Sequence, residues 1–222
     1  MRLSKLICSL ALLLVLLSAL GCQKSSRGQG SARDARSDAA QAQLRPLPAN
    51  SSPELKRVVE AELELTKQTT GYDATYVKID YPGGDVPLEA GVCTDVVIRA
   101  FRKGGVDLQK EVHEDMQRNF QAYPKTWKLT RTDTNIDHRR VPNLMIYFER
   151  QGKSLPVTSR SEDYLPGDVV TWNVNGLPHI GMVTNMWSAE TRNYLVVHNI
   201  GRGAQIENVL FTWPITGRFR YF

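Results

Sequence analysis

The chain has 222 residues, 41% of them hydrophobic and 23% charged, and a formal net charge of +5 at pH 7. The positive surplus lies in residues 1–52, because residues 53–222 hold 21 of the 28 basic and 21 of the 23 acidic residues. A neutral stretch of this length suits one domain with a hydrophobic core, which we expect to be monomeric, and it lacks the charge that nucleic-acid binding requires.

Residues 1–22 have the pattern of a secretory leader. Two basic residues precede an almost wholly apolar run over 6–17, which is shorter than the roughly 20 residues that span a bilayer. The Gly-Cys pair that ends at Cys22 resembles a bacterial lipobox, which implies acylation of Cys22; ordinary cleavage with release is the alternative. We expect an exported, periplasmic lipoprotein with a membrane anchor, and Gln23 favours the outer membrane.

Residues 23–52 are predicted to be a disordered linker. They are rich in Ser, Ala, Gln, Gly and Arg and contain no aromatic residue, so they cannot bury enough apolar area to offset the loss of chain entropy. The folded domain is therefore expected to cover 53–222.

The hydrophobic periodicity predicts helices in the first part of the domain and strands in the second. Helices are expected over 53–68, 93–103 and 108–122, with a fourth from Pro142 to just before Gly152. Residues 72–81 look extended and 82–85 form a turn. Short strands are expected at 168–173, 179–186, 194–199 and 218–222. Helices followed by an antiparallel sheet indicate an α+β domain.

Cys93 is the one cysteine left in the domain once the leader is removed, so no disulfide forms within the domain. It opens the helix over 93–103, where free N–H groups and the helix dipole favour thiolate over thiol. His179 and His198 follow far downstream on predicted strands. A lone thiol with a distant histidine is typical of a cysteine nucleophile; a buried, inert cysteine is the alternative.

Several motifs in order carry a resemblance to a known family. They are Gly-Val-Cys-Thr-Asp-Val-Val over 91–97, Asn-Ile-Asp-His-Arg-Arg over 135–140, Pro-Gly-Asp-Val-Val over 166–170, Pro-His-Ile-Gly-Met-Val over 178–183 and His-Asn-Ile-Gly over 198–201. Together they resemble the bacterial family called domain of unknown function 1287, over nearly all of 55–222.

More remotely, the chain is similar to the NlpC-type cell-wall cysteine peptidases of the papain-like superfamily. That resemblance implies a papain-like fold and cleavage of peptide bonds in peptidoglycan stems, typically next to γ-D-glutamyl and diaminopimelate residues. The chain departs from the pattern at 92–95, where Val-Cys-Thr-Asp replaces Asp-Cys-Ser-Gly, and in the long interval between Cys93 and His179. These departures leave the substrate specificity open.

The catalytic roles follow from this pattern. The thiolate of Cys93 is expected to attack a carbonyl and form an acyl-thioester that water hydrolyses, with the backbone N–H of Cys93 at the oxyanion. His179 is the expected general base and later general acid. Either His198 or Asn199 orients it, and since neighbours on a strand face opposite sides, only one can serve; we favour His198. Tyr81 is a candidate for the oxyanion region, with an ordinary half-buried tyrosine as the alternative.

A dense charged cluster precedes the fourth helix, and the sequence leaves its role undecided. It either binds substrate carboxylates or forms an internal salt-bridge network, and it consists of Asp137, His138, Arg139 and Arg140. Asp95 is expected to be a first-turn helix acid, Asp168 a turn residue before a strand, and His113 a solvent-exposed residue.

The sequence contains neither His-Glu-x-x-His nor Cys-x-x-Cys, so neither a metal site nor another cofactor is expected. The leading hypothesis is a cysteine peptidase or amidase that acts on peptidoglycan peptides. The alternatives are an acyltransferase with the same Cys/His site and a non-catalytic lipoprotein that binds the cell wall.

Overall fold

Helices occupy the first half of the domain and strands the second, as predicted. The computed structural model describes residues 41–222, so the predicted leader, Cys22 and the linker up to residue 40 lie outside the described residues. The helices are α2 (Pro53–Gln68), α3 (Cys93–Lys103), α4 (Leu108–Arg118) and α5 (Val141–Arg150). The strands are β1 (Gln43–Leu44), β2 (Val169–Val174), β3 (Leu177–Ser188), β4 (Asn193–Asn199), β5 (Ala204–Glu207) and β6 (Ile215–Phe219).

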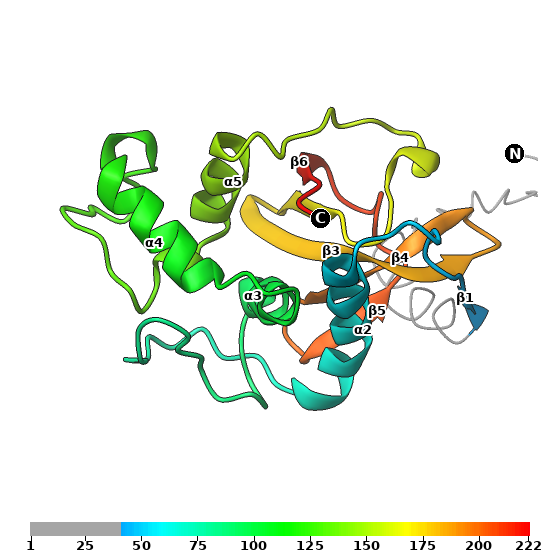
Figure 1. The fold of residues 1–222 in the computed structure, drawn as a ribbon, viewed down its shortest axis with the longest axis horizontal. Helices are drawn as coiled ribbons and strands as arrows, with labels where there is room; N and C mark the ends of the chain where they lie inside the picture. Colours follow the sequence, from blue (N-terminus) through cyan, green and yellow to red (C-terminus); the bar gives the residue numbers. More distant parts are fainter. Residues whose placement is uncertain (1–40) are drawn as a thin grey trace, which may run out of the picture.

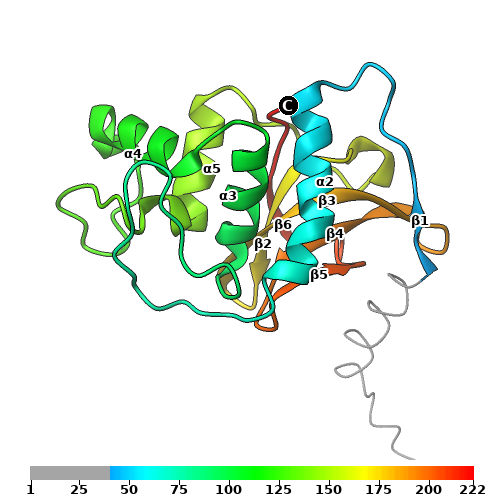
Figure 2. The same cartoon turned by 60° about the horizontal axis from the view of Figure 1, so that its bottom comes forward.

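The strands form one antiparallel sheet in the order β5-β4-β3-β2-β6, and β1 pairs with the far end of β3. Figures 1 and 2 show α2 and α3 side by side on one face of this sheet, with α4 and α5 beyond α3. In the part of the chain that the structure describes, no helix is long and apolar enough to cross a membrane. The predicted α+β class is confirmed.

Successive side chains of each strand point to opposite faces of the sheet, and both faces carry buried apolar side chains. Ile180 and Val197 belong to the main core, which includes the buried side of α3. Trp172 and Val196 belong to a second buried cluster. The core of the domain thus lies between the helices and the sheet, and a smaller apolar layer covers the other face.

Local signals start the two helices that cover the sheet. The Ser52 hydroxyl accepts a hydrogen bond from the Leu55 N–H at 3.0 Å, and Pro53 occupies the first turn of α2. At the start of α3, the Asp95 carboxylate accepts the Val92 N–H at 2.6 Å. Each helix therefore begins at the residue that the sequence predicts.

Two elements, α4 and β6, differ from their predicted bounds by three residues or more, and β5 was not predicted. Helix α4 ends at Arg118 rather than near 122, because the Asn119 side chain bonds back to Asp115 and a short 3₁₀ turn follows. Strand β6 begins and ends earlier than the predicted 218–222. Strand β5 was not predicted at all: Ala-Gln-Ile-Glu has little intrinsic preference for a strand, and it forms one by pairing with β4.

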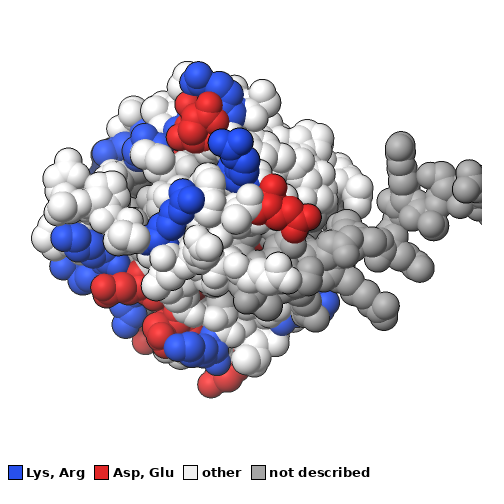
Figure 3. Space-filling model, turned by 90° about the vertical axis from the view of Figure 1, so that its right-hand side faces the viewer, with Lys and Arg blue, Asp and Glu red and all other residues white. Residues whose placement is uncertain are grey.

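The part of the predicted linker 23–52 that the structure describes contains an ordered strand, β1. Strand β2 pairs with β3 only as far as Met182, which leaves the edge at 186–187 for β1 to occupy. Arg45 also stacks over the Trp187 ring at 3.7 Å. This ordered attachment lies at the end of the molecule that Figure 3 shows, where basic and acidic side chains are interspersed.

Candidate active site

The first turn of α3 is fixed by a buried ion pair. Arg139 donates to both oxygens of Asp95, at 2.9 and 3.0 Å, and Asp95 in turn accepts the Val92 N–H. A Cβ at Gly91 would lie 2.8 Å from the Asp95 carboxylate, so only glycine allows this close approach. Asp95 is thus the first-turn acid that was predicted, and it holds the backbone on both sides of Cys93.

The Cys93 thiol is buried, with 8% of the residue exposed. Burial raises the pKa of this thiol to about 11, although the backbone N–H groups of Ile180, Thr94 and Cys93 itself act in the opposite direction. The predicted thiolate is therefore wrong for the resting protein. The free energy lost by removing the thiolate from water exceeds the stabilisation that the N–H groups and the helix dipole provide.

Two imidazoles and a carboxylate form a hydrogen-bonded chain on the sheet. His179 Nε2 lies 2.8 Å from His198 Nδ1, and His198 Nε2 lies 3.0 Å from a Glu207 carboxylate oxygen. Because the carboxylate only accepts, His198 carries its proton on Nε2 and accepts at Nδ1, so His179 donates from Nε2. The remaining nitrogen of His179, Nδ1, then holds a free lone pair and can take up a proton.

His179 is neutral at physiological pH. Burial, and to a lesser extent His198, lowers the pKa of its imidazole to about 3. The rings of Trp172 and Trp213 lie 6.0 and 5.9 Å from that of His179, and these indoles exclude water from it. The environment therefore favours a neutral base.

Glu207 was missed by the sequence reasoning. It lies on the unpredicted strand β5 and pairs with Val196, two residues before His198, so Glu207 and His198 share a face of the sheet. The sequence does show a glutamate at the end of a short segment that follows the strand with His198, but such a pattern is common. Only the strand register makes Glu207 the partner of His198.

Gly181 allows the two histidines to meet. It lies opposite His198 in the β3–β4 pair, two residues after His179. A Cβ at Gly181 would lie 2.7 Å from the Val197 carbonyl oxygen and 3.0 Å from the Cβ of His198. Any side chain at this position would displace β4 and break the imidazole pair.

The Cys93 thiol interacts with the backbone of β3 next to the hydrogen-bonded line of His179, His198 and Glu207. The Ile180 N–H that acts on the Cys93 sulfur belongs to the residue directly after His179. Among the described residues no hydrogen bond joins this sulfur to either imidazole, since Ile180 faces the helices whereas His179 contacts the aromatic rings of the second face. The structure therefore does not bring the thiol and His179 together, and a direct contact between them requires the His179 ring to move.

Asn199, which was the alternative to His198 as the third catalytic residue, has a different role. Its side-chain amide donates to the carbonyl oxygens of Gly71 and Gly91, at 3.0 and 2.9 Å. These bonds tie the end of β4 to the segment before Cys93. Asn199 is a positioning residue, and His198 is the one that contacts His179.

Tyr81 does not lie at the thiol. Its ring packs edge-on against His113, with ring centroids 5.1 Å apart. The tyrosine near the sulfur is Tyr72, whose pKa is raised by burial and then by Cys93 and Asp95. Tyr72 was missed because its distance to Cys93 along the sequence is longer and the chain between them is irregular.

Most of the charged cluster before α5 is internal. Asp137, His138 and Arg139 are buried, and the Thr94 hydroxyl donates to the Arg139 carbonyl oxygen at 3.1 Å. His113, predicted to be exposed, is 6% exposed and its Nδ1 lies 3.7 Å from Asp137. The salt-bridge alternative therefore describes Asp137 and Arg139, and Arg139 ties the cluster to α3; His138 is buried without an ion pair among the described residues.

Asp168 is a second buried carboxylate at a strand start. It lies directly before β2 and accepts from Arg220 at 2.6 Å and from Arg218 at 3.3 Å. The predicted turn position is correct, and the two arginines explain why this acid is buried. It contacts none of the candidate catalytic residues and holds β2 against β6.

Comparison with known proteins identifies the family. A family model described as Domain of unknown function (DUF1287) matches residues 58–221. The chain belongs to the DUF1287 family. It is similar to the Uncharacterized protein YijF of Escherichia coli (strain K12), with 57% identity over 155 residues, which are 69% of this chain and 75% of that protein. The predicted family is confirmed.

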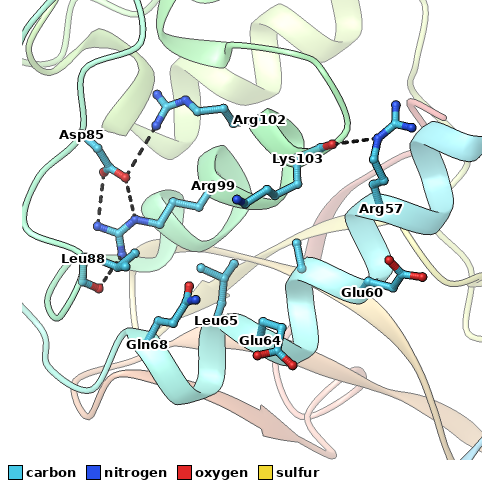
Figure 4. Close-up of a pocket in the computed structure, with 11 residues that line it drawn as sticks. Arg57, Glu60, Glu64, Leu65, Gln68, Asp85, Leu88, Arg99, Arg102 and Lys103 are labelled. Carbon is cyan, nitrogen blue, oxygen red and sulfur yellow. Dashed lines mark hydrogen bonds and ion pairs between the residues drawn. The ribbon is translucent and has the colours of Figure 1, made fainter.

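A cavity of about 610 Å³ in this DUF1287 domain lies between α2 and α3, away from the thiol (Figure 4). Arg99, on its wall, donates to Asp85, to the Thr69 hydroxyl and to several backbone carbonyls, so its donors are already used. Neither Cys93 nor the two histidines line the cavity. Within 41–222, no three His, Cys, Asp or Glu side chains come together as metal ligands.

Proposed function

We propose that this DUF1287 protein is a cysteine hydrolase, a peptidase or amidase, that cleaves peptide bonds in peptidoglycan stem peptides. The supporting observation is the chain from Glu207 through His198 to His179, which ends next to the backbone N–H that contacts the Cys93 sulfur. Burying three ionisable groups in one line costs free energy, and such arrangements concentrate at functional sites.

In the proposed mechanism, the His179 ring turns to the helix face of β3 when substrate binds, and its Nδ1 takes the proton of the Cys93 thiol as the sulfur attacks the scissile carbonyl carbon. The thiol and the imidazole are both neutral at rest, because their pKa values are about 11 and about 3. Proton transfer therefore accompanies the attack and does not precede it. The backbone N–H of Cys93 stabilises the oxyanion.

The second half of the reaction returns this proton. The imidazolium of His179 is stabilised by His198 and Glu207 and protonates the leaving amine, which gives the acyl-thioester. Water then loses a proton to His179, attacks the thioester carbon and releases the acid, and the proton returns to the sulfur. Atoms and charge balance over the cycle, and no cofactor takes part.

The substrate class and location rest on the resemblance to NlpC-type peptidases. A helix that begins at a cysteine, packed on an antiparallel sheet with histidines, fits a papain-like fold of that type. We propose that the protein is exported to the periplasm and anchored by a lipid on Cys22, with the outer membrane favoured. It acts there as a monomer on peptidoglycan and has no nucleic-acid partner.

Digestion of purified peptidoglycan tests the proposal. The mature protein is expected to change the mass profile of the released muropeptides, whereas Cys93→Ala and His179→Ala leave the profile of untreated wall. Arg160→Gln, at an exposed position, serves as a matched control and should digest like the wild type. If Cys93→Ala releases the same fragments as the wild type, the proposed nucleophile is wrong.

One observation favours a non-catalytic role as the second candidate. The thiol is buried, and among the described residues it makes no hydrogen bond to an imidazole. Acid quenching during digestion separates the two roles, because a hydrolase accumulates an acyl adduct on Cys93 that mass spectrometry detects. A wall-binding protein retains its unmodified mass. An acyltransferase would show the adduct and transfer the acyl group to an added amine.

A further inference from the structure

Arg140 differs from the other three residues of the charged cluster. Its side chain is 16% exposed, yet the guanidinium donates no hydrogen bond to any described residue, and Nη1 is buried without a hydrogen-bond partner. The nearest carboxylate oxygen, of Asp137, lies 3.8 Å away, beyond hydrogen-bond range. Buried donors in proteins are nearly always satisfied, so an arginine with free donors requires an explanation.

The guanidinium is held in place by stacking. Its central carbon lies 4.3 Å from the centroid of the Trp127 ring, and Trp127 is itself 41% exposed. Stacking covers a face of the guanidinium plane; Nη1 is buried, and the N–H donors of Nε and Nη2 lie on its partly exposed edge. The group is therefore oriented in advance, with these accessible donors available to a ligand.

Arg140 also lies close to the nucleophile along the fold. The carbonyl of the preceding residue, Arg139, accepts the hydroxyl of Thr94, which directly follows Cys93. Two to four extended residues of a bound peptide cover roughly 7–14 Å from the thiol. A peptide bound at the thiol can therefore reach the guanidinium with a group a few residues from the scissile bond.

We propose that Arg140 binds a carboxylate of the substrate peptide and so selects where the peptide is cut. This inference rests on the proposed function, because it assumes that a peptide occupies the Cys93 site. A carboxylate matches the planar fork of a guanidinium with two parallel hydrogen bonds. Asp133 and Asp137 lie beside Arg140, so two carboxylates face one guanidinium, and we expect selectivity for the carboxylate rather than high affinity.

The test compares two peptides on a protein that cannot consume them. The full mature chain with Cys93→Ala is titrated calorimetrically with the stem tetrapeptide from purified peptidoglycan, and with the same peptide after its carboxylates are amidated. The free acid should bind about tenfold more tightly, the lower end of what a charged hydrogen bond contributes. Adding Arg140→Gln should make the two affinities equal.

Two further variants guard against misfolding and general charge effects. Arg140→Lys keeps the charge but not the fork, so it should retain only part of the discrimination. Arg118→Gln removes an exposed arginine from α4 and should retain all of it. If Arg140→Gln is folded and still prefers the free acid tenfold, or if the wild-type site binds both forms equally, the inference is overturned.

Wall digestion by the protein with Cys93 intact separates this inference from the proposed function. Digestion that depends on Cys93, together with discrimination that does not depend on Arg140, would refute only the carboxylate site. If the wall is not digested and neither peptide binds, both proposals fail.

Discussion

The sheet and the segment over 133–140 both bury charged and polar side chains, but they satisfy them differently. On the sheet, His179, His198 and Glu207 form an unbroken line of hydrogen bonds at 2.8 and 3.0 Å. In the other segment, buried atoms of Asp137, His138 and Arg140 have no hydrogen-bond partner, and neither does Nδ1 of His113 on the adjacent α4. Strand register aligns side chains at fixed intervals, whereas an irregular segment with a short 3₁₀ turn does not.

The comparison suggests that the sheet supplies the chemistry and the irregular segment supplies recognition and support for the helix of the nucleophile. A preformed hydrogen-bonded line costs no reorganisation during a reaction. Unsatisfied donors, in contrast, are available to a ligand. The predictions below either break this division or define it more sharply.

The largest effect is expected from Arg139→Met. This change leaves Asp95 buried without its bidentate partner, which typically costs about 3–5 kcal/mol. Urea denaturation should show this loss in the free energy of unfolding. Arg160→Met, at an exposed ion pair, should cost less than about 1 kcal/mol. Equal costs for the two variants would mean that the segment over 133–140 does not support α3.

Glu207→Gln tests the line of hydrogen bonds on the sheet. The amide can donate to His198, which favours the wrong tautomer of both imidazoles. The kcat for peptidoglycan digestion should fall by up to roughly 10⁴-fold, the loss found when the carboxylate of a catalytic triad is replaced by an amide and the tautomer is lost. The KM and the thermal stability should change little. A variant that digests at the wild-type rate would show that the line is structural only.

The pH dependence of stability compares the two regions directly. Burial lowers the pKa of His179 and that of His138 from 6.5 to about 3. Below pH 6.5 the unfolded chain therefore binds more protons, and stability is lost as the pH falls from 6.5 towards 3. Each imidazole contributes a slope of roughly 1.4 kcal/mol per pH unit.

Urea titrations between pH 6.5 and 4.5 measure these slopes. His179→Gln and His138→Gln should each reduce the wild-type slope by the contribution of one imidazole, and the double variant by both. If a variant leaves the slope unchanged, the imidazole that it removes is already protonated in the folded protein. The surroundings of that imidazole would then be more polar than its contacts indicate.

The smallest effect is expected from Gly181→Ala. The added Cβ meets the Val197 carbonyl oxygen at 2.7 Å, and overpacking of this kind costs about 1–3 kcal/mol. Because the added Cβ displaces β4, which carries His198, the rate of peptidoglycan digestion should fall by more than the loss of stability explains. Gly176→Ala, at a turn where a Cβ meets nothing within 4 Å but φ is +89°, controls for the strain of adding a methyl group.

The sequence by itself determined the elements whose signals are local. Ser52-Pro53 starts α2, and the apolar periodicity after Cys93 defines α3, so the thiol was placed at a helix N-terminus correctly. Alternation placed His179 and His198 on strands and allowed only one of His198 and Asn199 to face His179. These inferences hold because capping and side-chain periodicity depend on residues within a few positions of one another.

The tertiary structure alone decided which groups meet and how far they are desolvated. Glu207 reaches His198 through the register of β4 and β5, Arg139 reaches Asp95 across 44 positions, and Tyr81 packs against His113 rather than at the thiol. The raised pKa of Cys93 likewise depends on the whole core that surrounds it. Strand register and burial depend on contacts between residues that are far apart in the sequence, so a local sequence pattern does not determine them.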